Sequence, residues 1–507
     1  MRNKSIKNIT YSYGSVIITS LLGFVTLPLS LNYFGKDLFG LFSITGDTLA
    51  YLALFNFGIP WAAATIFAKL NSQLEQKRVI LKALTLLFVF SFLMIISLFI
   101  VHLLFPNWVH FISNISASIT PTAKLFISIS IIFFIARLPF SLFSQLLIFI
   151  NHAYVAKIID VFSVVLNFIC LLIVIYLKLT IVQYALMSGF FSLVPLVFSV
   201  MIFLQIWKST SLAQSLVAED QVVSYRHLIE SSFYFFLNSI GTLLVWNTDS
   251  LVISHYLGLG ETAEYAVMFK FFTILFMIIS QLMNVINPLY PKLMKEGRQE
   301  ELAKLFNTMI KLFPIIGGVV FLVMFGVYKD FVLLWTHNDR VFIGYLSCFA
   351  MGLYYYFLCS SVVPYSVLMS LNYSKEIYLF TLCDALLNLC LSIYLVTKIG
   401  VAGVVIATLI AHVLMLFVLV PIKLNKLIPN LFKFDYFYVL KHLGFAIFPS
   451  GMLIYFLNTY SLSWFKILAL ILIFFFYLMM SFIVLGKRDI NNIKKELMSK
   501  FTAAKYQ

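Results

Sequence analysis

Charged residues are scarce in this sequence of 507 residues: Asp, Glu, Lys and Arg make up 11% of it, and hydrophobic residues make up 62%. A soluble protein needs about twice that share of charge to cover its surface. A disordered chain, conversely, lacks enough apolar side chains to build a core. The composition therefore excludes both classes and predicts a polytopic membrane protein.

The sequence also lacks the motifs of several enzyme classes. It holds no GxxxxGK[ST] phosphate loop for ATP-driven transport, no HExxH metal site and no nucleophile elbow. The five cysteines lie in apolar runs and form no CxxC pair, so neither a disulfide framework nor a zinc site is indicated. We therefore expect no catalytic residue, no metal and no cofactor.

Apolar segments long enough to cross a bilayer recur along the whole chain. One crossing takes about 20 residues, and the sequence predicts an all-α membrane protein with about fourteen transmembrane helices. The segments lie near 9–34, 39–66, 79–105, 122–150, 155–177, 181–207, 228–257, 262–291, 302–328, 342–371, 376–397, 401–422, 438–458 and 463–485. No cleavage signal follows the first segment, so we expect it to be retained.

Polar stretches group these spans into two sets of six and a final pair. We expect a six-helix lobe at 1–207, a cytoplasmic linker at 208–227 and a second six-helix lobe at 228–422. A basic linker at 423–437, two helices within 438–486 and a basic tail at 487–507 follow. Most of the 35 Lys and Arg residues fall in alternate loops, which predicts that both termini are cytoplasmic. The net charge of +15 is then a topology signal and a contact with anionic lipids, not a nucleic-acid surface.

The two six-span sets repeat each other at an offset of about 222 residues. Tyr33 and Gly35 match Tyr256 and Gly258, for example, at the end of the first span of each set. Since each set has an even number of spans, both enter the membrane in the same direction. This is the parallel repeat found in some secondary transporters.

Polar residues recur on single faces of several predicted spans. They can fasten helices together or line a hydrated cavity between the halves, and stripes that end on charges favour the cavity. The clearest stripes are Asn8, Ser12, Ser15, Thr19, Thr26 and Ser30 in the first span, Ser231, Asn238, Thr242 and Asp249 in the seventh, and Lys270, Thr273, Ser280, Gln281, Asn284 and Asn287 in the eighth.

Six of the charged residues inside predicted spans are candidates for a functional site, because a charge buried in a membrane is expensive. The cations are Arg137 and Lys270, and the acids are Asp47, Asp249, Asp160 and Asp384. One interpretation is mutual neutralisation, such as Asp47 with Lys270 or Asp249 with Arg137, which would hold the halves in register. The other is contact with a substrate or a coupling ion, and both interpretations stay open.

Three stretches of this sequence resemble the MOP superfamily of multidrug, oligosaccharidyl-lipid and polysaccharide exporters, and within it the Wzx-type polysaccharide flippases. They are SIKNITYSYGSVIITSLLGFVTLPLSLNYFGKDLFGLFSI, DSLVISHYLGLGETAEYAVMFKFF and NLCLSIYLVTKIGVAGVVIATLIA, and the resemblance covers residues 1 to about 420. It implies two six-helix lobes around a cavity that opens alternately to each side. It also implies export of an undecaprenyl-diphosphate-linked oligosaccharide, such as an O-antigen, capsule or exopolysaccharide unit, across the bacterial inner membrane.

In such a protein, cationic residues of the cavity meet the diphosphate, and Arg137 and Lys270 are the candidates here. Asn238, Thr242, Gln281 and Asn284 are further candidate substrate-binding residues, and Asp47, Asp249, Asp160 and Asp384 are candidates for ion coupling or salt bridges. Expected partners are the lipid-linked glycan, membrane lipids, and a polysaccharide polymerase with its chain-length regulator. Export of a drug or of lipid II by the same fold, and polysaccharide polymerisation, remain alternatives.

Overall fold

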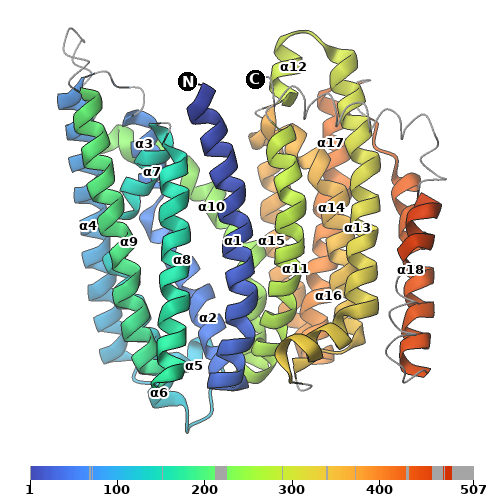
Figure 1. The fold of residues 1–507 in the computed structure, drawn as a ribbon, viewed down its shortest axis with the longest axis horizontal. Helices are drawn as coiled ribbons and strands as arrows, with labels where there is room; N and C mark the ends of the chain where they lie inside the picture. The colour runs from blue at the N-terminus through green and yellow to red at the C-terminus, as the bar shows by residue number, and fades with distance from the viewer. Residues whose placement is uncertain are drawn as a thin grey trace. The chain divides into compact units, whose positions relative to one another are not determined.

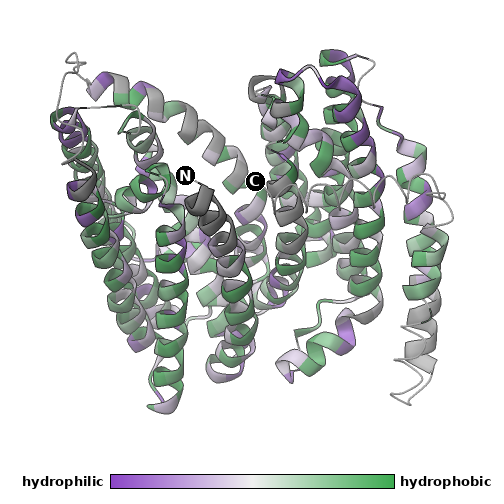
Figure 2. Cartoon of the chain, turned by 45° about the horizontal axis from the view of Figure 1, so that its top comes forward, coloured by the Kyte–Doolittle hydropathy of each residue, from purple (hydrophilic) through white to green (hydrophobic). Residues whose placement is uncertain are grey.

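The computed structural model describes residues 2–67, 70, 72–150, 152–211, 225–287, 289–338, 341–371, 373–429, 433–459, 472 and 474–481. Throughout these residues the regular elements are helical, with no strand among them. Ten helices in the described ranges are long and apolar enough to cross a membrane, and hydrophobic residues run along most of their length (Figure 2). The predicted all-α membrane fold is confirmed.

The chain forms two compact units, divided after Ala263. The helices of the first unit, labelled in Figure 1, are α1 (Arg2–Phe34), α2 (Lys36–Leu52), a 3-10 turn (Ala53–Asn56), α3 (Ile59–Phe67), α4 (Gln73–Leu104), α5 (Val109–Ile112), α6 (Thr120–Arg137), α7 (Ser141–Phe149), α8 (Ala153–Tyr176), α9 (Ile181–Ser211) and α10 (Tyr225–Tyr256). Helix α8 packs between α1 and α9, α3 packs on α7, and α10 packs on α2 and α3. The lobe boundaries expected from the sequence stay a prediction, but α10 belongs to the first compact unit by its contacts.

The second unit holds most of α11 (Leu259–Ile286) and the helices that follow. These are α12 (Leu289–Lys295), α13 (Gln299–Thr336), α14 (Tyr345–Ser370), α15 (Ser374–Ile399), α16 (Val401–His412), a π-helical turn (Val413–Val418), α17 (Leu419–Leu427) and α18 (Tyr436–Thr459). Helix α14 contacts α13 and α16, and α18 packs on α13. The Tyr477 hydroxyl donates to the Ile315 carbonyl at 3.0 Å, which fastens the helical segment 474–481 to α13.

Two predicted spans are each broken into two helices. The span expected at 39–66 ends its first helix at Leu52, passes through the 3-10 turn, and restarts as α3 after Phe57 and Gly58, whose φ angles are 48° and 71°. The span expected at 122–150 breaks between Arg137 and Ser141. Pro139 explains the second break, because it has no N–H to donate and its ring clashes with the carbonyl four residues before it.

The turns of the two repeats match. Gly35 and Gly258 both have positive φ angles, 83° and 108°, and lie one residue after α1 and two residues after α10. Lys178 and Gly400, with φ of 55° and 61°, lie two residues after α8 and one residue after α15. The break at Ala53–Gly58 has no such counterpart, because α11 is continuous through the corresponding residues, near 276–281. The two repeats therefore share positive φ angles at these two pairs of positions, and the first differs from the second at this break.

Candidate functional site

Polar residues join α2 to α10 within the first unit, and we call this group the seam: Asp47 and Tyr51 of α2, and Thr248, Asp249 and Ser250 of α10. Its two acids lie at one end. The Ser250 hydroxyl and the charge of Asp249 both act on the Asp47 carboxylate. Asp249 and Ser250 are buried, and Asp47 is half-buried. The structure thus brings together two of the four acids that the sequence singled out.

The next step along the seam is a hydrogen bond between Tyr51 and Thr248, whose hydroxyl oxygens are 2.6 Å apart. The Thr248 hydroxyl donates to the Leu244 carbonyl at 2.5 Å. Its single hydrogen is therefore used, and Tyr51 must be the donor to Thr248. This bond fixes the register of α2 against α10.

Beyond the acids, the loop that carries α5 is fastened to α10. The Asn114 amide donates to the Ser254 carbonyl at 2.9 Å, and the side chains of Ser113 and Ser254 are hydrogen-bonded to each other. Nearby, α2 approaches the chain closely at Gly40, where an added Cβ would lie 2.0 Å from the Leu259 carbonyl oxygen. Helix α10 is thus held at both sides of the acid pair.

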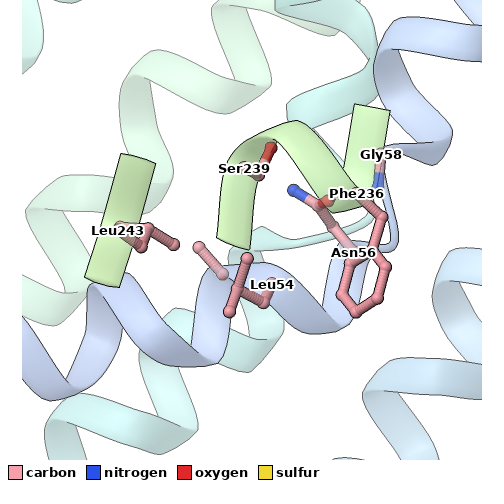
Figure 3. Close-up of a pocket in the computed structure, with 7 residues that line it drawn as sticks. Leu54, Asn56, Gly58, Phe236, Ser239 and Leu243 are labelled. Atoms are coloured by element: carbon pink, nitrogen blue, oxygen red, sulfur yellow. Dashed lines mark hydrogen bonds between the residues drawn. The ribbon is translucent and has the colours of Figure 1, made fainter. Parts of the chain in front are cut away.

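The broken part of α2–α3 forms a cavity of about 270 Å³ at the other end of the seam. The cavity is lined by Ala53, Leu54, Asn56 and Gly58 from the break and by Phe236, Ser239 and Leu243 of α10 (Figure 3). The Gly58 amide donates to Asn56 Oδ1 at 2.8 Å, which holds the turn in place. This cavity was not predicted from the sequence, although FNFGIP at residues 55–60 carries an N-x-G turn signal inside an apolar run.

Arg137 is the last residue of α6, where the helix carbonyl dipoles favour a positive charge. Its side chain is exposed and forms no hydrogen bond or ion pair with any described residue of the first unit. The Asp249–Arg137 pair considered from the sequence is therefore not formed here. Lys270, on α11, is likewise exposed and has no such partner among the described residues of the second unit.

Asp160 and Asp384 lie in different environments. Asp160 is exposed and pairs with Lys157 at 3.0 Å. Asp384 is buried, one helical turn from Asn388, whose Oδ1 accepts bonds from Ser392 at 3.0 Å and Thr408 at 3.1 Å. Asp160 is thus a surface ion pair, and Asp384 belongs to a buried polar group between α15 and α16.

The four uncharged candidates for substrate binding lie on α10 and α11. Asn238 and Thr242 lie on α10, and Gln281 and Asn284 lie on α11, but their side chains fall outside the described residues. On α1, the hydroxyls of Thr19, Thr26 and Ser30 bond to carbonyls of their own helix. Within the described ranges, no three His, Cys, Asp or Glu side chains gather as metal ligands do.

Solved structures with a similar fold are transporters of the MOP superfamily. The lipid II flippase MurJ in an inward closed conformation has a TM-score of 0.68 and 17% identity, over 92% of this chain and 98% of that one. The MATE multidrug transporter DinF-BH has a TM-score of 0.59 and 16% identity, over 85% of this chain and 95% of that one. At these identities the likeness shows the fold.

Two Salmonella proteins, each named "Putative O-antigen transporter", are similar in sequence. The S. typhi protein is 22% identical over 417 residues, which are 80% of this chain and 92% of that protein. The S. typhimurium protein is 25% identical over 208 residues, and the match spans about half of its length, 48%. Residues 5–294, more than half of this chain, match the family described as polysaccharide biosynthesis protein. The chain therefore belongs to the polysaccharide biosynthesis protein family.

Proposed function

We propose that this protein is a flippase that moves an undecaprenyl-diphosphate-linked oligosaccharide from the cytoplasmic to the outer leaflet of the bacterial inner membrane. The observation that carries the proposal is the similarity, over 80% of the chain, to the S. typhi protein named "Putative O-antigen transporter". The fold shared with MOP transporters supports it. Transport rather than catalysis is the activity that follows, with both termini in the cytoplasm.

The physical task explains why such a protein needs a polar interior. A glycan diphosphate that enters hydrocarbon loses the hydration of its charges and hydroxyls, which is very costly. Polar side chains replace that hydration while the polyprenyl tail stays in lipid. Two negative charges that move outward gain roughly 4–5 kcal/mol per 100 mV of inside-negative potential, at about 2.3 kcal/mol per charge. The membrane potential alone can therefore favour export.

We assign the diphosphate to Arg137 and Lys270. Both side chains are exposed and have no ion-pair partner among the described residues of their own units, so they are available to an anion. Asn238, Thr242, Gln281 and Asn284 are the proposed glycan contacts. Capsule or exopolysaccharide units would meet the same groups as O-antigen.

The acid pair of the seam is the proposed coupling element. Asp47 and Asp249 repel each other when both are charged, and a proton on either removes that repulsion. Protonation would therefore change the packing of α2 against α10, and the negative charges would help to release the diphosphate. Asp384, inside its polar group in the second unit, is a further candidate for ion coupling.

The test is mass spectrometry of the lipids that copurify with the wild type and with the Arg137→Ala/Lys270→Ala variant. We expect a polyprenyl-diphosphate glycan on the wild type and its loss from the variant. The matched control is Arg298→Ala, which removes an exposed cation that already pairs with Glu296 and Glu301. Retention of the glycan lipid and of surface polysaccharide in the double variant would refute the assignment of the two cations.

The second candidate is export of lipid II or of a drug by the same fold, which the likeness to MurJ and DinF-BH favours. Deletion of the gene distinguishes the candidates. Loss of surface polymer in viable cells supports the first, whereas an essential gene supports lipid II. Polymer synthesis by the purified protein would instead make it a polymerase, the least supported of the alternatives.

A further inference from the structure

The cavity lies at the Ala53–Gly58 break, which has no counterpart in the described backbone of the second repeat, where α11 is continuous. It is formed where an otherwise membrane-long helix stops and restarts, and α10 closes its other side. Phe57 adopts a left-handed conformation, with φ of 48°, that a bulky side chain seldom takes. Backbone of this kind persists only where the surrounding structure holds it, and it is common at binding sites.

The wall of the cavity combines apolar surface with a small number of polar groups. Ala53, Leu54, Phe236 and Leu243 supply the apolar part, and none of the lining residues is charged. The Phe236 ring lies 5.0 Å from that of Phe57, and Phe57 lies 4.7 Å from Phe90, measured between ring centroids. The aromatic wall is therefore supported from behind and presents a fixed surface.

Asn56 supplies the cavity with a hydrogen-bond donor, its side-chain –NH2 group. The Gly58 amide can only donate, so the Asn56 atom that faces it must be the oxygen, and the –NH2 group is left for other partners. That group has no acceptor among the residues that the structure describes. Figure 3 shows it turned away from Phe236, towards the part of α10 that carries Ser239.

A pyranose ring has the matching chemistry. Its C–H face packs on the electron-rich face of an aromatic ring, and its hydroxyls accept from an amide and exchange hydrogen bonds with a serine hydroxyl. The volume of about 270 Å³ is below the roughly 300–1,000 Å³ of pockets that hold drug-sized ligands, so it suits one sugar ring and not a whole oligosaccharide.

We infer that the cavity between the α2–α3 break and α10 binds one neutral sugar ring of the transported glycan, with Phe236 as the packing surface and Asn56 as a donor to a hydroxyl. This inference rests on the proposed flippase function. The diphosphate does not belong here, because no charged side chain lines the cavity to offset its desolvation. A polyprenyl tail would leave the Asn56 –NH2 group without an acceptor.

The experiment compares the affinity of the purified full-length protein, in nanodiscs, for two kinds of lipid. One is bare undecaprenyl diphosphate, and the other is undecaprenyl diphosphate bearing glucose, galactose or N-acetylglucosamine. We expect the wild type to bind at least one glycosylated lipid about tenfold more tightly than the bare lipid, the change that one well-placed hydrogen bond with its packing provides.

Two variants address the cavity by different routes. Leu243→Trp fills it, and Asn56→Asp keeps the oxygen that accepts from Gly58 but removes the –NH2 donor. Each should abolish the preference for the glycosylated lipid and leave the affinity for bare lipid within about twofold. Ile229→Trp, at an exposed site on the same helix, is the control and should keep the preference.

The outcomes separate this inference from the function on which it rests. If the wild type binds bare lipid but prefers none of the glycosylated lipids, or if both cavity variants keep the preference, the sugar site is refuted and the flippase stands. If the wild type binds neither kind of lipid, the proposed function fails as well. Thermal unfolding of each variant identifies a general loss of folding.

Discussion

The residue scale shows what charge and polarity in an apolar sequence can and cannot predict. Asp47 and Asp249 could be identified from the sequence as candidate functional residues, because a carboxylate inside a membrane span is costly and usually has a function. The proximity of these two acids could not be predicted, because it depends on the register of α2 against α10. The hydrogen bond between the Tyr51 and Thr248 hydroxyls fixes that register.

We predict that Asp47→Asn reduces transport at least tenfold while the protein stays folded. The amide keeps an oxygen that can accept the Ser250 hydrogen bond, and it removes one of two charges that repel each other, so stability should hold or rise. Complementation of a polysaccharide-deficient strain measures transport, and thermal unfolding measures stability. Asp160→Asn, at an exposed ion pair, serves as the control. Equal transport by the wild type, Asp47→Asn and Asp160→Asn would show that Asp47 has no part in the mechanism.

We predict that Tyr51→Phe lowers the free energy of unfolding by about 0.5–1.5 kcal/mol, the usual loss for one hydrogen bond. Thr248 keeps its bond to the Leu244 carbonyl, so no buried hydroxyl hydrogen is left unpaired. Denaturant unfolding in detergent is the measurement. A double-mutant cycle with Thr248→Val should show that the two losses are not additive, and full additivity would mean that the bond contributes nothing.

At the scale of elements, hydropathy located the helices but not the places where they break. Residues 39–66 and 122–150 are apolar throughout, so each was expected as one span. The breaks come from local backbone chemistry, which hydropathy does not register: Pro139 in one, and the N-x-G turn at Asn56–Gly58 in the other. The cavity at the α2–α3 break therefore could not be predicted from the hydrophobic periodicity of the sequence.

Helix α2 offers a matched pair of glycines. We predict that Gly40→Ala destabilises the protein by about 1–3 kcal/mol, because the new Cβ would lie 2.0 Å from the Leu259 carbonyl oxygen and force the backbones apart. Gly46→Ala meets nothing within 4 Å and should stabilise the helix by about 0.5–1 kcal/mol. Thermal unfolding checks both, and equal midpoints for the two variants would contradict the close approach at Gly40.

At the scale of the whole molecule, the internal repeat was the most informative sequence signal. It predicted corresponding turns, and the positive φ angles at Gly35 and Gly258 and at Lys178 and Gly400 agree with it. It could not predict where the repeats differ, since the break in the first depends on a few turn residues. Nor could it predict that α10, the first helix of the second repeat, packs in the first compact unit.

The positive φ angles at the matching positions Lys178 and Gly400 allow a test of this equivalence. Lys178 takes a left-handed conformation that costs an L-residue about 1–2 kcal/mol, whereas the corresponding Gly400 bears no such cost. We predict that Lys178→Gly raises stability by up to about 1 kcal/mol and that Gly400→Ala lowers it by at least that amount. Thermal unfolding of the two variants is the measurement, and a loss of stability for Lys178→Gly would show that the turns are not equivalent.

The break between α2 and α3 also has a consequence for biogenesis. With the 3-10 turn that follows it, α2 reaches 21 residues, about the length of one crossing, whereas α3 has 9 residues and is too short to cross the bilayer alone. We therefore expect α3 to enter the lipid together with α2 and not as a separate span. The bent form needs α7 and α10 as packing partners, and α10 is not complete until Tyr256 has left the ribosome. The transport-competent shape of this span is thus acquired long after the span itself has entered the membrane.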